Sequence, residues 1–274
     1  MIKTAVQLKA LVKNKANMLI RNYAMERFLE RISLSKYRNH FILKGGMLVS
    51  HVVGLDNRTT MDIDTTIINY SLNKENIVCM IEEIIAIEID DSMLFQIKSV
   101  EDIMEEHDYQ GIRVKLECQL QNTRIPLKVD ISTGDVITPK EINYIYQLMF
   151  EDRNIHILAY NIETILAEKL ETIITRDVVN TRIRDFYDIV VLCIQKENEI
   201  SINKLKMALT ATAKKRKSME IIQNGISILK RIEKDEGMKL LWINYQNRFD
   251  YAQEYNWCEV MDLIKSLYLK VISY

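Results

Sequence analysis

The hydrophobic and polar positions along the chain change their period at about residue 160. Before that point, short apolar or alternating runs are typical of β-strands, whose successive side chains point to opposite faces. These runs predict strands near residues 41–43, 61–68, 93–99, 110–121, 124–132, 142–149 and 155–159. Helical spacing of apolar residues predicts helices near 5–32, 47–53 and 73–88 among them. The first part should therefore be a mixed sheet with helices packed on it.

After residue 160, apolar residues recur only at helical spacing, which predicts helices near residues 162–175, 183–196, 201–213, 217–234, 238–248 and 257–272. Five of the seven glycines precede residue 135, which also favours a turn-rich first part and a helical second part. We therefore expect an α/β (α+β) core with a mixed sheet, followed by a C-terminal helical bundle. The expected domains are residues 1–160, with N-terminal helices, and residues 161–274, a helical domain that closes a cleft.

A double glycine follows the first predicted strand. Gly45 and Gly46 allow a turn with positive φ, or a close approach to a phosphate that any Cβ would obstruct. A helix beginning near Met47 would then direct its free N–H groups at an anion. The pattern predicts a phosphate-holding turn.

Two aspartates lie one residue apart in the predicted strand 61–68. With a period of two, Asp62 and Asp64 leave the same face while Ile63 packs behind them. Mg²⁺ prefers hard oxygen ligands of this kind, and Mn²⁺ accepts the same set. The alternative is a solvated strand face. The nearby double glycine and Arg58 favour the metal-binding interpretation over this alternative.

A lysine and two aspartates mark the second half. Asn161 is a plausible N-cap, and helical spacing places Lys169 at the edge of the buried stripe, where it either snorkels to water or reaches into a cleft. Asp185 and Asp188 share a helix face. They form either a surface ion-pair cluster or a site in which Asp185 orients Lys169 or acts as a general base. These alternatives stay open.

These motifs together resemble the AbiEii-type nucleotidyltransferase toxins, members of the DNA-polymerase-β-like nucleotidyltransferase superfamily. The resemblance runs from about Phe41 to Leu192 and rests on the segments Leu43-Lys-Gly-Gly46, Arg58-Thr-Thr-Met-Asp-Ile-Asp64, Leu166-Ala-Glu-Lys-Leu170 and Arg182-Ile-Arg-Asp-Phe-Tyr-Asp188. Many relatives in the wider superfamily carry Gly-Ser where this chain has Gly45-Gly46, so backbone N–H groups would have to serve for the missing serine hydroxyl.

The resemblance implies roles for individual residues. Asp62 and Asp64 would be catalytic and would bind metal, and Lys169 and Asp185, in preference to Asp188, would support activity. The family's first motif places Lys44, Gly45, Gly46, Arg58 and Thr60 at the nucleotide. Asp130 lies on the polar face of the strand 124–132, and by resemblance it would be a third metal ligand; the alternative is a solvent-facing aspartate. Lys169 and Asp185 would face the Asp62–Asp64 pair across an inter-domain cleft.

The resemblance also implies an activity. The chain would use Mg²⁺ or Mn²⁺ to transfer nucleotides from a nucleoside triphosphate to an acceptor, expelling pyrophosphate. It would be the toxin of a toxin–antitoxin or abortive-infection system whose antitoxin forms no stable complex with it. Its leading acceptor would be the 3′ end of tRNA, which would stop translation. Nucleotidylation of a protein hydroxyl and a non-catalytic nucleotide- or RNA-binding module are the alternatives.

Composition and charge limit the kinds of metal site, cellular location and partner that the sequence favours. The four cysteines are far apart, so neither a zinc site nor a disulfide framework is indicated. No apolar run approaches the length of a membrane span, so a cytoplasmic location is expected. The net charge is −1, yet residues 1–38 hold nine basic residues against two acidic ones. That stretch, like the run 214–217, fits an RNA partner or simply a solvated face.

Overall fold

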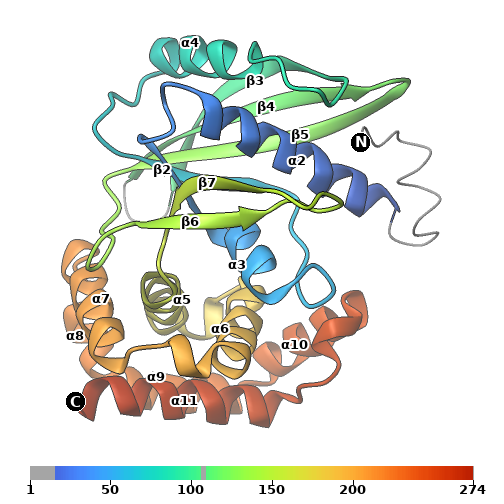
Figure 1. The fold of residues 1–274 in the computed structure, drawn as a ribbon. Coiled ribbons are helices and arrows are strands. Elements are labelled where there is room, and N and C mark those ends of the chain that lie inside the picture. The colour runs from blue at the N-terminus through green and yellow to red at the C-terminus, as the bar shows by residue number, and fades with distance from the viewer. Residues whose placement is uncertain (1–15, 106–108, 274) are drawn as a thin grey trace. The chain divides into compact units, whose positions relative to one another are not determined.

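The computed structural model describes residues 16–105 and 109–273, which divide into two compact units. Unit 1 holds the described residues up to 51 together with 59–135 and 141–159, and unit 2 holds 52–58, 136–140 and the described residues from 160 onward. Figure 1 shows the elements of both units. The first residues of the predicted helix 5–32, with Lys3, Lys9, Lys13 and Lys15, lie outside the described residues.

A seven-stranded mixed sheet forms the centre of unit 1. Its strands are β1 (Phe41–Lys44), β2 (Ile63–Ile67), β3 (Met93–Glu105), β4 (Tyr109–Leu120), β5 (Thr123–Thr133), β6 (Ile142–Gln147) and β7 (Asn154–Ala159), in the order β3-β4-β5-β2-β1-β7-β6. The β2–β5 and β1–β7 pairs are parallel, and the other pairs are antiparallel. The mixed sheet predicted from the alternating runs is confirmed.

Helices pack against this sheet and bury its apolar side chains. α2 (Ala16–Leu34) packs against β5 and β7, and α4 (Lys74–Ile85) packs against β3 and α2 (Figure 1). The Asn73 side chain begins α4 by accepting a hydrogen bond from the Asn76 backbone N–H. α3 (Gly45–Val53) follows β1 without a loop. Along β5, the apolar side chains at alternate positions are buried, so its other face is left for polar residues.

Two arginines of α2, Arg27 and Arg31, do not form a basic surface. Arg31 donates two hydrogen bonds to the carboxylate of Asp91, at 2.7 and 3.0 Å, and Arg27 donates one to Glu151 at 2.8 Å. Both arginines are almost fully buried. Neither a solvated face nor an RNA-facing surface therefore describes these two residues, because acids far along the chain neutralise them inside unit 1.

Unit 2 is helical from residue 162 onward. Its long helices are α5 (Ile162–Arg176), α6 (Ile183–Gln195), α7 (Ile202–Lys215), α9 (Gly225–Lys234), α10 (Glu236–Arg248) and α11 (Trp257–Ser273), with the short α8 (Met219–Gln223) before α9. α5 packs against α6, α7, α8 and α9, so its side chains are buried nearly all round. The predicted fold class, a mixed-sheet α/β core followed by a helical bundle, is confirmed.

One predicted helix, 217–234, is divided into α8 and α9 at Asn224. The break lies next to Gly225, where an added Cβ would lie 2.7 Å from the ring of Tyr268. The Tyr268 hydroxyl donates a hydrogen bond to the Ile222 carbonyl at the end of α8. Packing of α11 against the α8–α9 junction therefore replaces the continuous helix that the apolar spacing predicts.

The cysteines form no disulfide bond among the described residues. All four cysteines are free thiols, and Cys118 is buried while Cys79 and Cys258 are exposed. No helix among residues 16–105 and 109–273 is long and apolar enough to cross a membrane.

Glu26 is a buried carboxyl on α2 whose charge is opposed by its surroundings. It accepts a hydrogen bond from the Met149 backbone N–H at 2.9 Å, and Tyr146 also bonds to it. Burial raises the pKa of Glu26 to about 8, although these hydrogen bonds and the nearby Arg27 lower it. Between about pH 4.5 and pH 8 the folded chain therefore keeps a proton that the unfolded chain has released, and this stability is lost as the pH rises.

Replacing Glu26 by glutamine should remove this pH dependence, because glutamine fills the same space and cannot ionise. Between pH 5.5 and 7.5, we expect the free energy of unfolding of Glu26→Gln to rise relative to wild type by about 2 kcal/mol. Urea unfolding at each pH measures the difference. Glu88→Gln, at an exposed position, is the matched control and should track wild type. A wild-type-minus-Glu26→Gln difference that stays constant with pH would contradict this assignment.

Candidate active site

The double glycine brings the backbone against a carboxylate. Gly45 has a φ of +64°, and a Cβ at this position would lie 2.2 Å from Oδ2 of Asp64. The Gly46 N–H, in the first turn of α3, donates a hydrogen bond to the same oxygen at 3.2 Å. The expected positive φ is present, and the group that needs the missing Cβ is Asp64. The turn therefore holds the Asp64 carboxylate at the beginning of α3.

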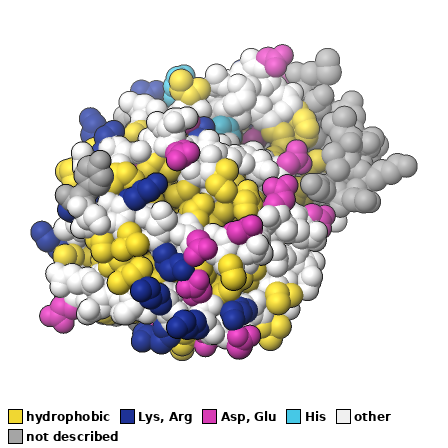
Figure 2. All heavy atoms as spheres, turned by 90° about the horizontal axis from the view of Figure 1, so that it is seen from below, with side chains coloured by type: hydrophobic (Ala, Val, Ile, Leu, Met, Phe, Trp, Pro, Cys, Tyr) yellow, Lys and Arg dark blue, Asp and Glu magenta, His cyan; other side chains and the backbone are white. Residues whose placement is uncertain are grey.

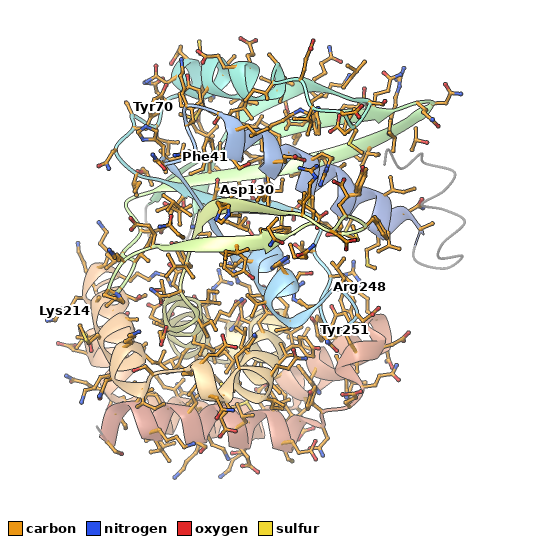
Figure 3. The ribbon with its side chains drawn as sticks, in the orientation of Figure 1. Phe41, Tyr70, Asp130, Lys214, Arg248 and Tyr251 are labelled. Atoms are coloured by element: carbon orange, nitrogen blue, oxygen red, sulfur yellow. The ribbon has the colours of Figure 1, made fainter. Side chains whose placement is uncertain are left out.

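Asp64 lies beside Asp130 because β2 and β5 are parallel and in register at these residues. Neighbouring residues in register point to the same face of a sheet, so the two carboxylates are side by side. Figure 3 labels Asp130 on β5. β2 begins at Ile63, so Asp62 lies in the bend before the strand, where Lys128 approaches it at 3.8 Å. The sequence pattern placed Asp62 inside the strand, and the structure places it at the strand's entrance.

The register extends this pair into a row across five strands. Lys44 of β1 lies opposite Asp64, and Arg113 of β4 lies opposite Asp130, with Glu101 of β3 next to Arg113. The row reads Lys44, Asp64, Asp130, Arg113, Glu101, so two adjacent anions are flanked by a cation on each side. Such an arrangement concentrates negative charge at its centre and fixes it from both ends.

The two carboxylates at the centre of this row, Asp64 and Asp130, repel each other. Burial, Asp130 and Asp62 raise the pKa of the Asp64 carboxyl, and Lys44 and the Gly46 N–H oppose this only in part. Because burial is the largest of these effects, the Asp64 carboxyl binds a proton more readily than an ordinary aspartate. A divalent cation would relieve the same repulsion.

The side chain of Lys44 is fixed by hydrogen bonds. Its ammonium donates hydrogen bonds to Ser132 Oγ and Asp135 Oδ2, both at 2.7 Å. Burial raises the pKa of Asp135, but Lys44 outweighs it, so the pKa is below its ordinary value. Asp135 therefore stays ionised and anchors Lys44 beside Asp64. The sequence analysis missed Asp135 as a partner, and no spacing signal connects two residues so far apart.

Asp130 is fully engaged by Arg113. Arg113 Nε donates to Oδ1 at 2.7 Å and its NH2 nitrogen donates to Oδ2 at 2.6 Å, a bidentate pair. The alternative of a solvent-facing aspartate does not describe Asp130, which is mostly buried. Arg113 was also missed, although a signal exists: the two-residue turn between β4 and β5, at Gln121 and Asn122, sets a register that places 113 opposite 130.

The donors suit a hard divalent cation in kind, but they are not gathered around one point. Asp62, Asp64 and Asp130 supply carboxylate oxygens, the ligands that Mg²⁺ prefers. Burial is the main cause of the raised pKa of Asp64, and the charges of Asp130 and Asp62 add to it. Within residues 16–105 and 109–273, no three His, Cys, Asp or Glu side chains are placed to hold a metal. Since Arg113 occupies both oxygens of Asp130, the third predicted ligand would have to exchange partners.

The second motif forms a buried ion-pair chain inside unit 2. Lys169 of α5 donates to Asp185 Oδ1 and to Asp188 Oδ2, each at 2.7 Å. Arg58 Nε donates to Asp188 at 2.6 Å, and Arg182 Nε donates to Asp185 at 2.8 Å. Lys169 thus reaches inward rather than to water, and the surface-cluster alternative applies only to Arg182, whose side chain is 43% exposed.

The charges in this chain stabilise one another. Burial lowers the pKa of Lys169 and raises those of the two aspartates, but in each case the opposite charges prevail, so Lys169 has a raised pKa and Asp185 and Asp188 have lowered ones. All three groups stay ionised at neutral pH. Arg58, predicted at the nucleotide, is committed here to Asp188, while Thr60 lies in unit 1 and donates to the Asp62 carbonyl at 3.3 Å.

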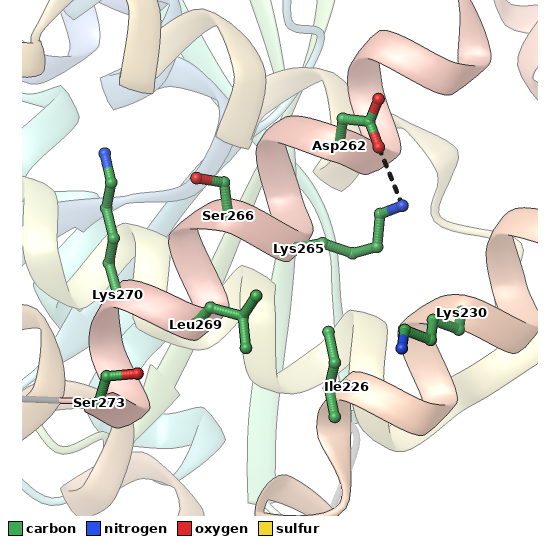
Figure 4. A pocket seen from close by; sticks show the side chains of 8 residues that line it. All are labelled: Ile226, Lys230, Asp262, Lys265, Ser266, Leu269, Lys270 and Ser273. Atoms are coloured by element: carbon green, nitrogen blue, oxygen red, sulfur yellow. Dashed lines mark ion pairs between the residues drawn. The ribbon is translucent and has the colours of Figure 1, made fainter.

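A separate open groove of about 650 Å³ lies between α9 and α11 of unit 2 (Figure 4). It is lined by Ile226, Lys230, Asp262, Lys265, Ser266, Leu269, Lys270 and Ser273, none of which is a predicted site residue. Lys265 is neutralised by Asp262 and Glu233. Figure 2 shows one face of the molecule, on which lysine and arginine side chains lie among hydrophobic and acidic ones. The groove is therefore a feature of unit 2 that has Lys230 and Lys270 in its lining and includes none of the predicted site residues.

The basic residues of the run 214–217 differ in their exposure to solvent. Lys214, labelled in Figure 3, is exposed, as are Lys215 and Lys217. Arg216 instead donates to Glu171 at 2.6 Å, and its side chain is largely buried. The three lysines are therefore the exposed residues of this run.

Comparison with known proteins gives a family and a fold. The family described as nucleotidyl transferase AbiEii toxin, type IV TA system, matches residues 27–263. JHP933 from Helicobacter pylori is similar at 16% identity, with a TM-score of 0.51, over 93% of this chain and 94% of that one. A protein assigned as a nucleotidyltransferase from H. pylori is similar at 16% identity, with a TM-score of 0.52, over 93% and 96%. No curated protein matches.

Alanine at position 45 should disable the site, because its Cβ cannot coexist with Asp64 where that carboxylate now lies. Gly54 provides the matched control, since its φ is +88° but a Cβ there meets only the Asn57 side chain, at 3.7 Å. Both variants should lose roughly 1–2 kcal/mol of stability for the positive φ. Only Gly45→Ala should also lower the rate of pyrophosphate release from a nucleoside triphosphate, by about 100-fold or more. Equal rates in the two variants would contradict the role given to the turn.

Removing Asp188 should destabilise unit 2 more than removing Asp185. Asp188→Asn removes the charge that Asp188 pairs with the buried Arg58 and should lower the free energy of unfolding by about 3–5 kcal/mol. Asp185→Asn leaves Arg182 exposed to water and Lys169 still paired with Asp188, so the loss should be smaller. Urea unfolding compares the two. A larger loss for Asp185→Asn would reverse this assignment.

Proposed function

Because the chain belongs to the AbiEii nucleotidyl transferase toxin family of type IV toxin–antitoxin systems, we propose that it transfers a nucleotide from a nucleoside triphosphate to the 3′ end of tRNA in a metal-dependent reaction. The observation that supports the site most directly is the contact of the Gly45–Gly46 turn with Asp64, next to Asp130. Two neighbouring carboxylates beside a helix N-terminus bring the charges that phosphoryl transfer needs into one place.

In the proposed reaction, the acceptor hydroxyl attacks the α-phosphate and releases its proton to solvent, a new oxygen–phosphorus bond forms, and pyrophosphate leaves with the electron pair of the broken bond. Asp62 and Asp64 would hold Mg²⁺ or Mn²⁺, with Asp130 as the third ligand. When bound, the cation would neutralise the phosphates and polarise the attacked phosphorus. Backbone N–H groups of the first turn of α3 would receive a phosphate oxygen, since no serine hydroxyl is present at Gly46.

The flanking cations have distinct proposed tasks. Lys44 is anchored by Asp135 beside Asp64, and it would balance the charge of the carboxylate pair while it contacts the nucleotide. Lys169 would stabilise charge on the transferring phosphates. Arg58 and Thr60 would contact the nucleotide, and their hydrogen bonds to Asp188 and to the Asp62 carbonyl would hold them in place.

Asp185 is better suited to positioning than to proton transfer. Lys169 and Arg182 lower its pKa against the effect of burial, whereas an effective general base has a pKa near the working pH. We therefore propose that Asp185 orients Lys169. Asp188 would serve mainly to hold Lys169 and Arg58 in place.

The acceptor and the biological setting are extensions of the family assignment. Modification of the tRNA 3′ end would stop translation and so inhibit growth, in the cytoplasm, where nucleoside triphosphates are present. The exposed lysines at 214, 215 and 217 are candidate contacts for the RNA backbone. The antitoxin would act without a stable complex with this chain, so the two proteins should not copurify.

Incubation of the full chain with each of the four labelled nucleoside triphosphates, Mg²⁺, total tRNA and cell protein tests the acceptor directly. We expect label in the tRNA fraction, and at least a 1,000-fold lower rate for Asp64→Asn. Asp185→Asn should lower the rate while remaining folded by circular dichroism. Label in protein alone would replace tRNA by a protein hydroxyl, and growth inhibition undiminished in Asp64→Asn would contradict the catalytic proposal.

A further inference from the structure

Arg113 occupies the place at Asp130 that a divalent cation would need. Its guanidinium sits in front of both carboxylate oxygens, at 2.7 and 2.6 Å, with the side-on geometry in which one cation satisfies two acceptors. Arg113 is about one-third exposed, whereas the Asp130 side chain is mostly buried. The arginine can therefore leave toward solvent more easily than the aspartate can turn away.

The row across the sheet gives Arg113 a second anionic neighbour. Asp130 of β5 is its register partner on one side, and Glu101 of β3 is its register partner on the other. The side chains of register partners share a face, so a guanidinium released from Asp130 remains next to a carboxylate. The Glu101 side chain is about half exposed and already accepts a hydrogen bond from Lys115 at 2.6 Å, so it can accommodate such a change.

We propose that Arg113 is a built-in competitor for the catalytic cation, which must displace its guanidinium from Asp130 before that carboxylate can serve as the third ligand. The inference rests on the proposed metal-dependent function and adds a residue that sets the affinity of the site for metal. A guanidinium cannot lose its charge under physiological conditions, so a cation of charge two placed beside it is repelled as well as excluded. Arg113 thereby limits metal occupancy until the metal, with its nucleotide, displaces it.

The affinity of the full chain for Mn²⁺, measured without nucleotide, tests this proposal without a measurement of activity. Electron paramagnetic resonance detects the free Mn²⁺ ion, at constant ionic strength. Arg113→Gln should lower the Kd for Mn²⁺ about tenfold, which corresponds to about 1.4 kcal/mol. Lys115→Gln is the matched control, because it removes one positive charge from the same face of β4, two residues along, without touching Asp130. It should change the Kd by less than about threefold.

Two further variants separate direct competition from a general charge effect. In an Asp130→Asn background, Arg113→Gln should change the Kd by less than about twofold, since no carboxylate remains to compete for. Arg113→Lys keeps the charge and loses the two-bond geometry, so the Kd should fall about threefold. If circular dichroism shows that Arg113→Gln does not fold, Arg113→Lys decides the question.

The outcomes distinguish this inference from the proposed function. A Kd that rises in Arg113→Gln, or falls no more than in Lys115→Gln, means that Arg113 holds Asp130 in a binding position, and the competition is overturned. Mn²⁺ binding that is absent from wild type and from Arg113→Gln, or unaffected by Asp64→Asn, overturns the metal site itself and this inference with it.

Discussion

The parallel pairing of β2 with β5 brings two carboxylates to adjacent positions, and the rest of unit 1 is arranged to tolerate them. Asp64 and Asp130 repel each other on one face of the sheet, and the pKa of Asp64 is raised as a result of burial and of this repulsion. Lys44 and Arg113 stand at the two ends of the pair, and Asp135 holds the first of these cations in place. Isolated like charges at such separation would be costly in a folded protein, so a persistent pair of this kind is typical of a site that binds a cation.

In the proposed reaction, the glycine turn would link this charge arrangement to the nucleotide. A side chain at position 45 would collide with Asp64, so a glycine here is a condition for bringing the beginning of α3 against the carboxylate pair. The helix N-terminus and the carboxylates have opposite preferences for charge. Triphosphate and cation bound together satisfy both at once, which fits the family's chemistry better than binding of either alone. Unit 2 contributes a second, self-contained set of paired charges around Lys169.

The elements of the fold follow closely from periodicity, whereas the partners of the charged side chains do not. Alternation along residues 124–132 correctly placed Asp130 on the polar face. The apolar stripe of residues 162–173 marked Lys169 as a border residue, whereas its side chain is buried against Asp185 and Asp188. The entrance of β2 was misjudged by two residues because Met61 and Asp62 continue the alternating pattern without joining the ladder. Pairs such as Lys44 with Asp135 and Arg58 with Asp188 join residues about 90 and 130 positions apart, and local patterns carry no information on them.

The central claim, that Asp64 and Asp62 gather a divalent cation beside the glycine turn, is tested most directly by a crystal structure of the full chain with Mn²⁺ and a non-hydrolysable nucleoside triphosphate. The account predicts an anomalous-scattering peak bonded to oxygens of Asp62 and Asp64 at roughly 2.0–2.2 Å, with a phosphate near the Gly46 N–H. A Mn²⁺ peak elsewhere, with Asp64 still bonded to Gly46 as it is now, would contradict it.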